Sequence, residues 1–245
     1  MSEPVPTLAV VIPMMNEEAN VQPLVDEVCT ALRGRLDFEL IVVDDGSTDG
    51  TWAALEALRA SVPELRPLRH RRNFGQSAGI LSGVRAARAP WIATLDGDGQ
   101  NDPADIPRLW ALVAGDPATP RLIAGNRVRR RDTWLRRLSS RTANRVRQAL
   151  LHDDCPDTGC GLKLFPRKAF LELPHFDHLH RFLPALAKRA GIEVVNVPVN
   201  HRPRSRGRSK YGVHNRLWVG LVDLAGVMWL QRRPCRPEWV ESADG

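Results

Sequence analysis

Two aspartates, Asp96 and Asp98, stand one residue apart in the stretch TLDGDGQNDP, directly after the apolar run PWIA. The apolar run predicts a buried strand, so both carboxylates fall at a strand end. Carboxylates this close raise each other's pKa unless a cation or a hydrogen-bond donor compensates them, and a divalent metal is the economical explanation. Ligands that are all oxygen suit Mg²⁺ or Mn²⁺, and these cations in turn suit phosphate groups.

Polar side chains also follow two other predicted strands. Asn16 and Glu17 come after the run LAVVIP, and the run FELIVVDD ends in Asp44 and Asp45. In parallel α/β sheets, ligands bind beyond the carboxyl ends of the strands. We therefore expect three strand ends to converge on one acidic crevice.

Two simpler interpretations of the paired aspartates fail. DGDGQNDPADIP resembles a calcium loop, but Asn101 stands at position 6, where such loops need glycine, and Pro107 at position 12, where they need glutamate. Alternatively the acids only cap the next helix. Asp102 or Asp105 suffices for that purpose, which leaves Asp96 and Asp98 unexplained.

The elements that must position these residues alternate between short β-rich runs and longer amphipathic stretches. Strands are predicted over 8–13, 38–45, 65–70, 90–96 and 120–127, and helices over 18–34, 49–61 and 76–88. This order is typical of an α/β fold with a mostly parallel, doubly wound sheet. A length of 245 residues suits one large domain, alone or with an appendage.

The pattern changes after residue 126. We expect an arginine-rich helix over 134–151, a polar loop, a helix over 180–190, a strand over 193–203 and a basic loop over 204–212. The last feature, NRLWVGLVDLAGVMWLQRRP, is apolar over a stretch that gives about 20 Å of helix, too short to cross a membrane. It could lie in a membrane interface with Trp218 and Trp229 at headgroup level, or these tryptophans could be core residues.

The positive charge is localised. The net charge is +7, yet residues 127–147 hold nine arginines and one acid, a local +8 that leaves about −1 for the rest of the chain. A solvated charged helix normally mixes signs, so this segment is expected to face an anion. Nucleic acid, a phosphorylated substrate and an acidic membrane surface all qualify. A nucleic-acid-binding module would not need the acidic strand ends, and the segment lacks interleaved aromatic residues.

A set of motifs in order resembles a known family. The motifs are VVIPMMNEE, IVVDDGSTDGT, RRNFGQSAG, LDGDGQNDP, AGNRVRR, DTGCGLK, HRFLPAL and VPVNHRPRSRGRSKYG. Together, over about residues 7–232, they resemble the polyprenyl-phosphate sugar transferases of glycosyltransferase family 2, the dolichyl-phosphate mannosyltransferase group. The resemblance implies the GT-A fold, a nucleotide-sugar donor, an inverting transfer and a lipid-phosphate acceptor. It also implies a cytoplasmic enzyme, peripheral on the inner face of the plasma membrane, that makes lipid-linked sugars for cell-envelope glycans.

The resemblance assigns roles residue by residue. Those implied on the donor side are Pro13, Asn16, Glu17, Asp44, Asp45, Asn73, Gly75, Arg202, Ser209 and Lys210. Asp96, Asp98 and Gln100 match the metal and diphosphate site, which implies Mg²⁺ or Mn²⁺, and Arg127, Arg136 and Ser140 match the site of the acceptor phosphate. His180 and Arg181 border the sugar or acceptor pocket. The family often has alanine at Gly97, a difference not expected to affect metal ligation.

The implied acceptor determines the expected mechanism. A phosphate monoester is already anionic at pH 7, so it attacks without a general base, and Asp96 is the fallback base. Metal and arginines then orient the two anions and stabilise the departing nucleoside diphosphate. An alternative is a family 2 enzyme with a glycan hydroxyl acceptor. The resemblance leaves both the sugar and the nucleotide open, and it divides the chain into a GT-A domain, 1–212, and a membrane-proximal helix with its tail, 213–245.

Overall fold

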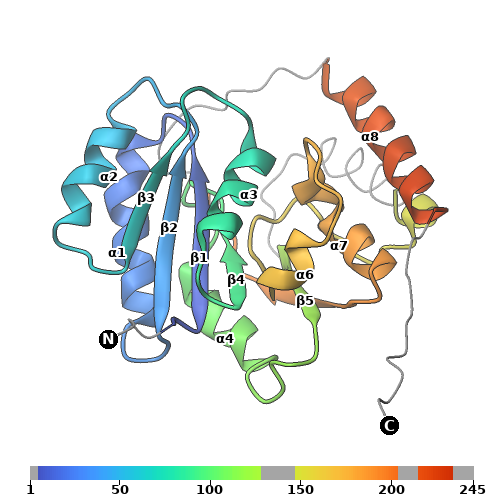
Figure 1. Ribbon diagram of the computed structural model, residues 1–245, viewed down its shortest axis with the longest axis horizontal. Helices are drawn as coiled ribbons and strands as arrows, with labels where there is room; N and C mark the ends of the chain where they lie inside the picture. The colour runs from blue at the N-terminus through green and yellow to red at the C-terminus, as the bar shows by residue number, and fades with distance from the viewer. Residues whose placement is uncertain (1–4, 128–146, 204–214, 234–245) are drawn as a thin grey trace, which may run out of the picture.

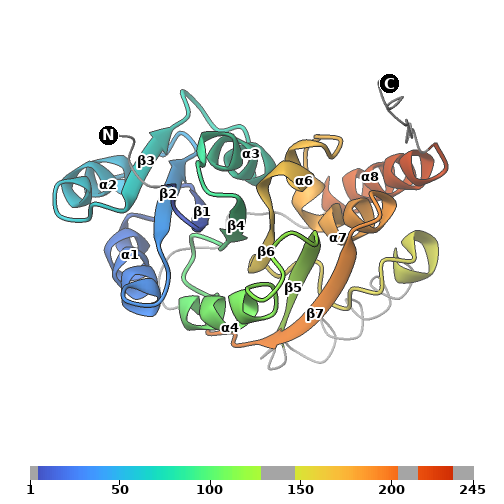
Figure 2. The same ribbon diagram turned by 60° about the horizontal axis from the view of Figure 1, so that its bottom comes forward.

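The computed structural model describes residues 5–127, 147–203 and 215–233. Seven strands form one sheet in the order β3-β2-β1-β4-β6-β5-β7, with helices on both faces (Figures 1 and 2). The strands are β1 (Leu8–Met14), β2 (Phe38–Asp44), β3 (Leu65–Arg69), β4 (Trp91–Thr94), β5 (Arg121–Arg127), β6 (Lys163–Pro166) and β7 (Glu193–Val199). The helices are α1 (Glu18–Leu32), α2 (Thr51–Arg59), α3 (Gln76–Ala86), α4 (Ile106–Ala111), α6 (Arg167–Leu171), α7 (Leu179–Arg189) and α8 (Asn215–Gln231), with a 3₁₀ turn at Pro103–Asp105.

The first four strands form the predicted parallel half. β1 lies between β2 and β4 and is parallel to both, and β3 adds to the outer edge of β2. Every residue of β1 and β2 is buried, as expected for a parallel sheet covered on both faces. In this register Met14 pairs with Asp44 and Val11 pairs with Thr94. The three parallel strands β1, β2 and β4 therefore end at the same edge of the sheet.

The second half is mixed. β6 runs antiparallel to both β4 and β5, whereas β7 is parallel to β5. Strand β6 is not predicted from the sequence, because four residues after a glycine-rich loop show no readable period. Tertiary contacts create this strand: Phe165 pairs with Ile92 and Leu164 pairs with Ala93.

Two apolar layers hold the helices on the sheet. Leu8, Val10 and Ile12 of β1 pack in one buried cluster with residues of α1, α2 and α4. The alternate residues Ala9 and Val11 join the other cluster, with α3, α6, α7 and α8. The alternation follows from the two-residue period of a strand. The loop that follows β1 therefore starts from a strand that is packed on both faces.

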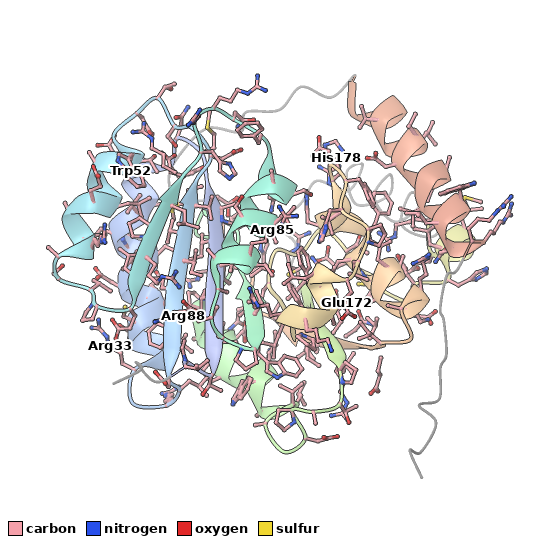
Figure 3. All side chains as sticks on the ribbon, viewed as in Figure 1. Arg33, Trp52, Arg85, Arg88, Glu172 and His178 are labelled. Carbon is pink, nitrogen blue, oxygen red and sulfur yellow. The ribbon has the colours of Figure 1, made fainter. Side chains whose placement is uncertain are left out.

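Helix α8 lies along α7 at the end of the molecule farthest from β3 (Figures 1 and 2). Its Val227 is fully buried in the cluster that includes α7. His178, just before α7 and labelled in Figure 3, lies with Nδ1 3.0 Å from Oδ2 of Asp223 on α8. Within the described ranges, no helix combines the length and apolar character needed to cross a membrane.

The segments expected to be basic fall largely outside the described residues. Of the arginine-rich helix predicted over 134–151, only the final turn, 147–151, is described, and it is helical. The predicted acceptor residues Arg136 and Ser140 lie outside the described ranges, and so do Ser209 and Lys210 of the basic loop.

Candidate active site at the carboxyl ends of the strands

Acidic residues meet where β2, β1 and β4 end. The backbone N–H of Asp45 donates to the carbonyl of Met14 at 2.8 Å, and that of Leu95 donates to Val11 at 3.2 Å. These bonds carry the sheet register into the loops that follow. The predicted convergence of the three strand ends is therefore observed, and it places Asp44, Asp45 and Asp96 along one edge.

Asp44 offers a buried acceptor. Its side chain is fully buried, and Oδ1 accepts from the backbone N–H of Ser47 at 3.0 Å. Oδ2 lies 3.2 Å from Nε of Arg69 but takes part in no hydrogen bond within the described residues. The Arg69 guanidinium in turn lies over the ring of Trp52, 5.4 Å from its centroid. A buried oxygen without a donor suits an N–H group of a nucleobase, the role that the resemblance implies.

Asp45 holds a loop in place. Its carboxylate accepts from the backbone N–H groups of Phe74 at 2.9 Å and Gly75 at 2.8 Å, and it lies 2.7 Å from Nδ1 of His70. Gly75 has φ +90°, a conformation that favours glycine. The resemblance assigns Asp45 to base or ribose, whereas its visible contacts position the segment that carries exposed Asn73.

The loop after β1 is fastened to the loop after β2. Oδ1 of Asn16 accepts from the backbone N–H of Thr48 at 2.7 Å, and the backbone N–H of Glu17 donates to Oγ1 of Thr51 at 2.9 Å. Pro13 is buried at the end of β1. With the Asp45 contacts, three loops thus form one connected rim around the strand ends.

Asp96 is the most perturbed acid of this edge. Burial, followed by the charge of Asp98, raises the pKa of Asp96 to about 6, although Lys163 and Arg127 act in the opposite direction. Nε2 of Gln76 donates to Oδ1 of Asp96 at 2.7 Å. A β-carbon at Gly161 would overlap the carboxyl group, so this glycine makes room for it.

The turn after Asp96 is tightly fitted. Oδ1 of Asp98 accepts from the backbone N–H of Gln100 at 3.1 Å. A β-carbon at Gly97 would lie 2.6 Å from Cγ of Met14 and 2.8 Å from the carbonyl oxygen of Pro13. The alanine common in the family at this position would require a shift of the neighbouring strand end in this chain.

These residues fit a divalent cation. The charge of Asp98 helps to raise the pKa of Asp96, and a cation between the two carboxylates would relieve their repulsion. Within the described ranges, no group of three or more His, Cys, Asp and Glu residues could hold a metal ion. Further ligands would have to be an amide oxygen such as that of Gln100, water, or phosphate oxygens, which is how Mg²⁺ is commonly held in proteins.

Arg127 is held by Asp157, an acid that is not among the site residues predicted from the sequence. Its Nε and Nη2 donate to Asp157 at 2.6 and 2.7 Å, and its backbone N–H donates to Oδ2 of Asp157 at 3.2 Å. Such a bidentate pair fixes the plane of the guanidinium. The charge of Arg127 reaches Asp96 and lowers the pKa of that carboxyl, so the predicted acceptor arginine lies beside the predicted metal site.

Arg202, which the resemblance assigns to the donor side, is paired with two acids in this structure. The guanidinium donates to both carboxylate oxygens of Glu27 at 2.9 Å and to Asp102 at 3.0 Å. The backbone N–H of Arg202 donates to the carbonyl of Gln100 at 3.0 Å, and Nε2 of Gln100 donates back to the carbonyl of Arg202 at 3.3 Å. In this structure Arg202 therefore ties the segment after β7 to the turn that carries Gln100.

A cavity of about 270 Å³ opens beside Asp96, between α3, β6 and α7. Its polar lining includes Gln76, Lys163, His180 and Arg181. Burial lowers the pKa of His180 to about 3, so its imidazole is neutral, and Nδ1 lies 2.8 Å from Oγ of Ser77. Gln76 is not among the predicted site residues, although it lies in the motif RRNFGQSAG directly after Gly75, which the resemblance assigns to the donor side.

Comparison with known proteins identifies the family. The family model described as "Glycosyl transferase family 2" matches residues 9–174. The chain belongs to glycosyltransferase family 2, and it is therefore a glycosyltransferase with the GT-A fold.

One relative and two solved structures illustrate the similarity. The chain is 37% identical over 246 residues to the dodecaprenyl-phosphate galacturonate synthase of Rhizobium johnstonii, covering 94% of this chain and 69% of the relative. Glucosyl-3-phosphoglycerate synthase of Mycobacterium tuberculosis, solved with Mg²⁺ and uridine diphosphate, gives a TM-score of 0.65 at 19% identity. The match covers 92% of this chain and 79% of the synthase chain. A mannosyltransferase of Pyrobaculum calidifontis, solved with GDP-Man and Mn²⁺, gives a TM-score of 0.64 at 19% identity. The match covers 96% of this chain and 66% of the mannosyltransferase chain. At such identities the structures show the fold alone.

Asp45→Asn should destabilise the protein. The substitution removes the charge from an acceptor of two backbone N–H groups, a loss of about 1–3 kcal/mol in the free energy of unfolding. Urea denaturation measures it. The matched control is Glu56→Gln, an exposed carboxylate on α2, which should change stability by less than about 0.5 kcal/mol. Equal stability of the two variants would show that Asp45 does not hold the loop.

Asp96→Asn should stabilise the metal-free protein above pH 6. A carboxyl whose pKa rises from 3.8 to about 6 on folding contributes stability below pH 4 and loses it as the pH rises through 6. Removing the charge should therefore raise the free energy of unfolding at pH 7.5 by about 1–3 kcal/mol. It should also flatten the slope between pH 4 and 6. Urea denaturation of both proteins, in the presence of a chelator, measures the free energy of unfolding at each pH from 4 to 7.5. Parallel curves of this free energy against pH would show that the pKa of Asp96 is not raised on folding.

Proposed function

We propose that this protein transfers a sugar from a nucleoside-diphosphate sugar to a polyprenyl phosphate, with inversion at the anomeric carbon. The observation that carries the proposal is the 37% identity, over 94% of the chain, to a synthase whose name states a polyprenyl-phosphate product. The paired acids at the end of β4 support it, because they suit the metal that accompanies a diphosphate. In the reaction, the bond from the anomeric carbon to the donor diphosphate breaks and a bond to the acceptor phosphate oxygen forms.

The donor is expected at the connected rim. Asp44 would accept a hydrogen bond from the base through its buried Oδ2, and the loops that carry Asn16, Glu17 and Asn73 would enclose the nucleoside. Asp96, Asp98 and Gln100 would hold Mg²⁺ or Mn²⁺, the cations bound in the two solved structures described above. Such a cation would neutralise charge on the leaving diphosphate.

The acceptor phosphate is expected at Arg127. Because Asp157 already fixes the guanidinium plane, Arg127 is oriented before a phosphate arrives and loses little conformational entropy on binding it. The predicted Arg136 and Ser140 would complete this site. A phosphate acceptor needs no general base. Asp96, with a pKa near 6, is ionised at pH 7.5 and would serve as that base only for a hydroxyl acceptor.

We further propose that α8 and its tail, residues 213–245, form a membrane-proximal unit that touches the inner face of the plasma membrane. Val219, Leu221, Val222 and Trp229 of α8 are exposed, by 38%, 48%, 70% and 60%. Exposed apolar residues and a tryptophan on a helix without a spanning length suit an interfacial position. A polyprenyl phosphate lies in a membrane, so the enzyme must approach one.

Asp98→Asn should abolish transfer and metal-dependent donor binding. A thermal-shift panel of UDP, GDP and their sugars, each with Mn²⁺ or with chelator, measures the binding. Wild-type protein should be stabilised by one nucleotide with Mn²⁺, and the variant should lose at least about tenfold in affinity. Unchanged stabilisation with Mn²⁺ and with chelator would remove the metal from the proposal. Transfer to a glycan hydroxyl but not to polyprenyl phosphate would favour the alternative acceptor.

Val222→Asp should weaken membrane association. A charge on the exposed face of α8 opposes burial of that face among lipid headgroups, so the fraction floating with anionic vesicles should fall severalfold at low salt. The matched control is Leu112→Asp, at an apolar residue that is 45% exposed just after α4. Equal flotation of the two variants would contradict the proposal that α8 contacts the membrane. Wild-type protein that stays in the vesicle-free fraction at low salt would contradict it as well.

A further inference from the structure

The cavity beside Asp96 has the size and position of a sugar site. Ligand pockets commonly enclose roughly 300–1,000 Å³, so a cavity of about 270 Å³ suits one sugar ring better than a whole nucleotide sugar. It lies next to the acid that would hold the metal on the donor diphosphate. A sugar joined to that diphosphate therefore has this cavity within reach.

The floor of the cavity is apolar and its polar groups are few. Ile80, Phe165, Phe170 and Leu183 line it from α3, β6, α6 and α7. The neutral imidazole of His180 and the amide of Gln76 are already engaged with Ser77 and Asp96. Thr94 and Thr158 also bond within the protein, to Gly161 and Arg147. The two cationic side chains of the lining, Lys163 and Arg181, then set which charge the cavity prefers.

Lys163 brings a buried positive charge. The side chain is 4% exposed, and Nζ donates to the carbonyls of Thr158, at 3.1 Å, and Cys160. Both partners are neutral, and within the described residues no carboxylate lies within salt-bridge distance of it. A buried ammonium is costly unless an anion compensates it. Its charge acts on Asp96, but a cation bound there would use that carboxylate.

Arg181 brings a second charge, at the mouth. It lies in the first turn of α7, lines the cavity and is otherwise exposed to solvent. Within the described residues its guanidinium takes part in no hydrogen bond or ion pair. With the metal in place, the cavity would hold two cationic side chains and no uncompensated acid. Hydroxyl groups of a neutral hexose would not balance this charge.

We propose that this cavity selects a donor whose sugar carries a carboxylate, a hexuronic acid, and that Arg181 is the residue that binds this carboxylate. The inference rests on the proposed function and specifies its sugar. The positive charge of buried Lys163 lowers the electrostatic free-energy cost of bringing the sugar carboxylate close to the diphosphate. The forked guanidinium matches a carboxylate in a bidentate pair, which makes arginine suited to this task.

Uridine diphosphate galacturonate and uridine diphosphate galactose test the proposal, because they differ only in the carboxylate. The full chain is assayed with Mn²⁺ and a polyprenyl phosphate in detergent. Wild-type protein should use the galacturonate donor at least about tenfold better in kcat/KM. Arg181→Gln should remove most of this preference, mainly by raising KM for the galacturonate donor, and Arg181→Lys should restore part of it.

Two controls separate the carboxylate from the phosphates. Arg181→Gln should leave binding of uridine diphosphate alone within about twofold, which also shows that the variant is folded. Arg85→Gln, at an exposed arginine on α3 that does not line the cavity, should leave both donors unchanged (Figure 3). Equal loss for both donors and for uridine diphosphate would assign Arg181 to a phosphate and overturn the proposal.

The remaining outcomes distinguish this inference from the function it rests on. Equal use of the two donors, or no use of the galacturonate donor, overturns the inference. If galactose, glucose or mannose is then transferred from its nucleotide to polyprenyl phosphate, the proposed function stands without it. If no nucleotide sugar, galacturonate included, is transferred to that lipid, both fail.

Discussion

The charge gathered at one edge of the sheet is the constraint on which the rest of this structure depends. Parallel strands β2, β1 and β4 end together, and their register brings acids that are far apart in the chain to one place. Burial next to Asp98 raises the pKa of Asp96 to about 6. A fold selected for stability alone would not keep such a carboxyl there. The proposed divalent cation would compensate this charge.

Several other acids near this edge hold backbone groups and side chains in place. Asp45 binds two N–H groups of the following loop, Asp157 holds Arg127, and Glu27 with Asp102 holds Arg202. Each buried or half-buried acid thus fixes one wall of the crevice before any ligand enters. Preorganisation of this kind reduces the entropy that binding must overcome. It also explains why the site contains more acids than a metal needs.

The two faces of the sheet differ in what they serve. The helices of one apolar layer, α1, α2 and α4, support the connected rim. The other layer contains α3, α6, α7 and α8, and the first three of these border the cavity. The pair between His178 and Asp223 links the start of α7 to α8. The helix proposed to meet the membrane is therefore packed against the helix that carries His180 and Arg181. In the proposed function, donor sugar and lipid would approach from neighbouring parts of one apolar layer.

The sequence by itself determined the parallel half and the identity of the paired acids, because strand and helix periods are local and Asp96 and Asp98 are adjacent to a readable strand. It also determined the family, through motifs that keep their order. Only the tertiary structure decided that β6 forms, that Asp157 pairs with Arg127, and that Gln76, Lys163 and Arg181 surround one cavity. These relations join residues up to about a hundred positions apart, and no local pattern encodes which side chains meet across the sheet.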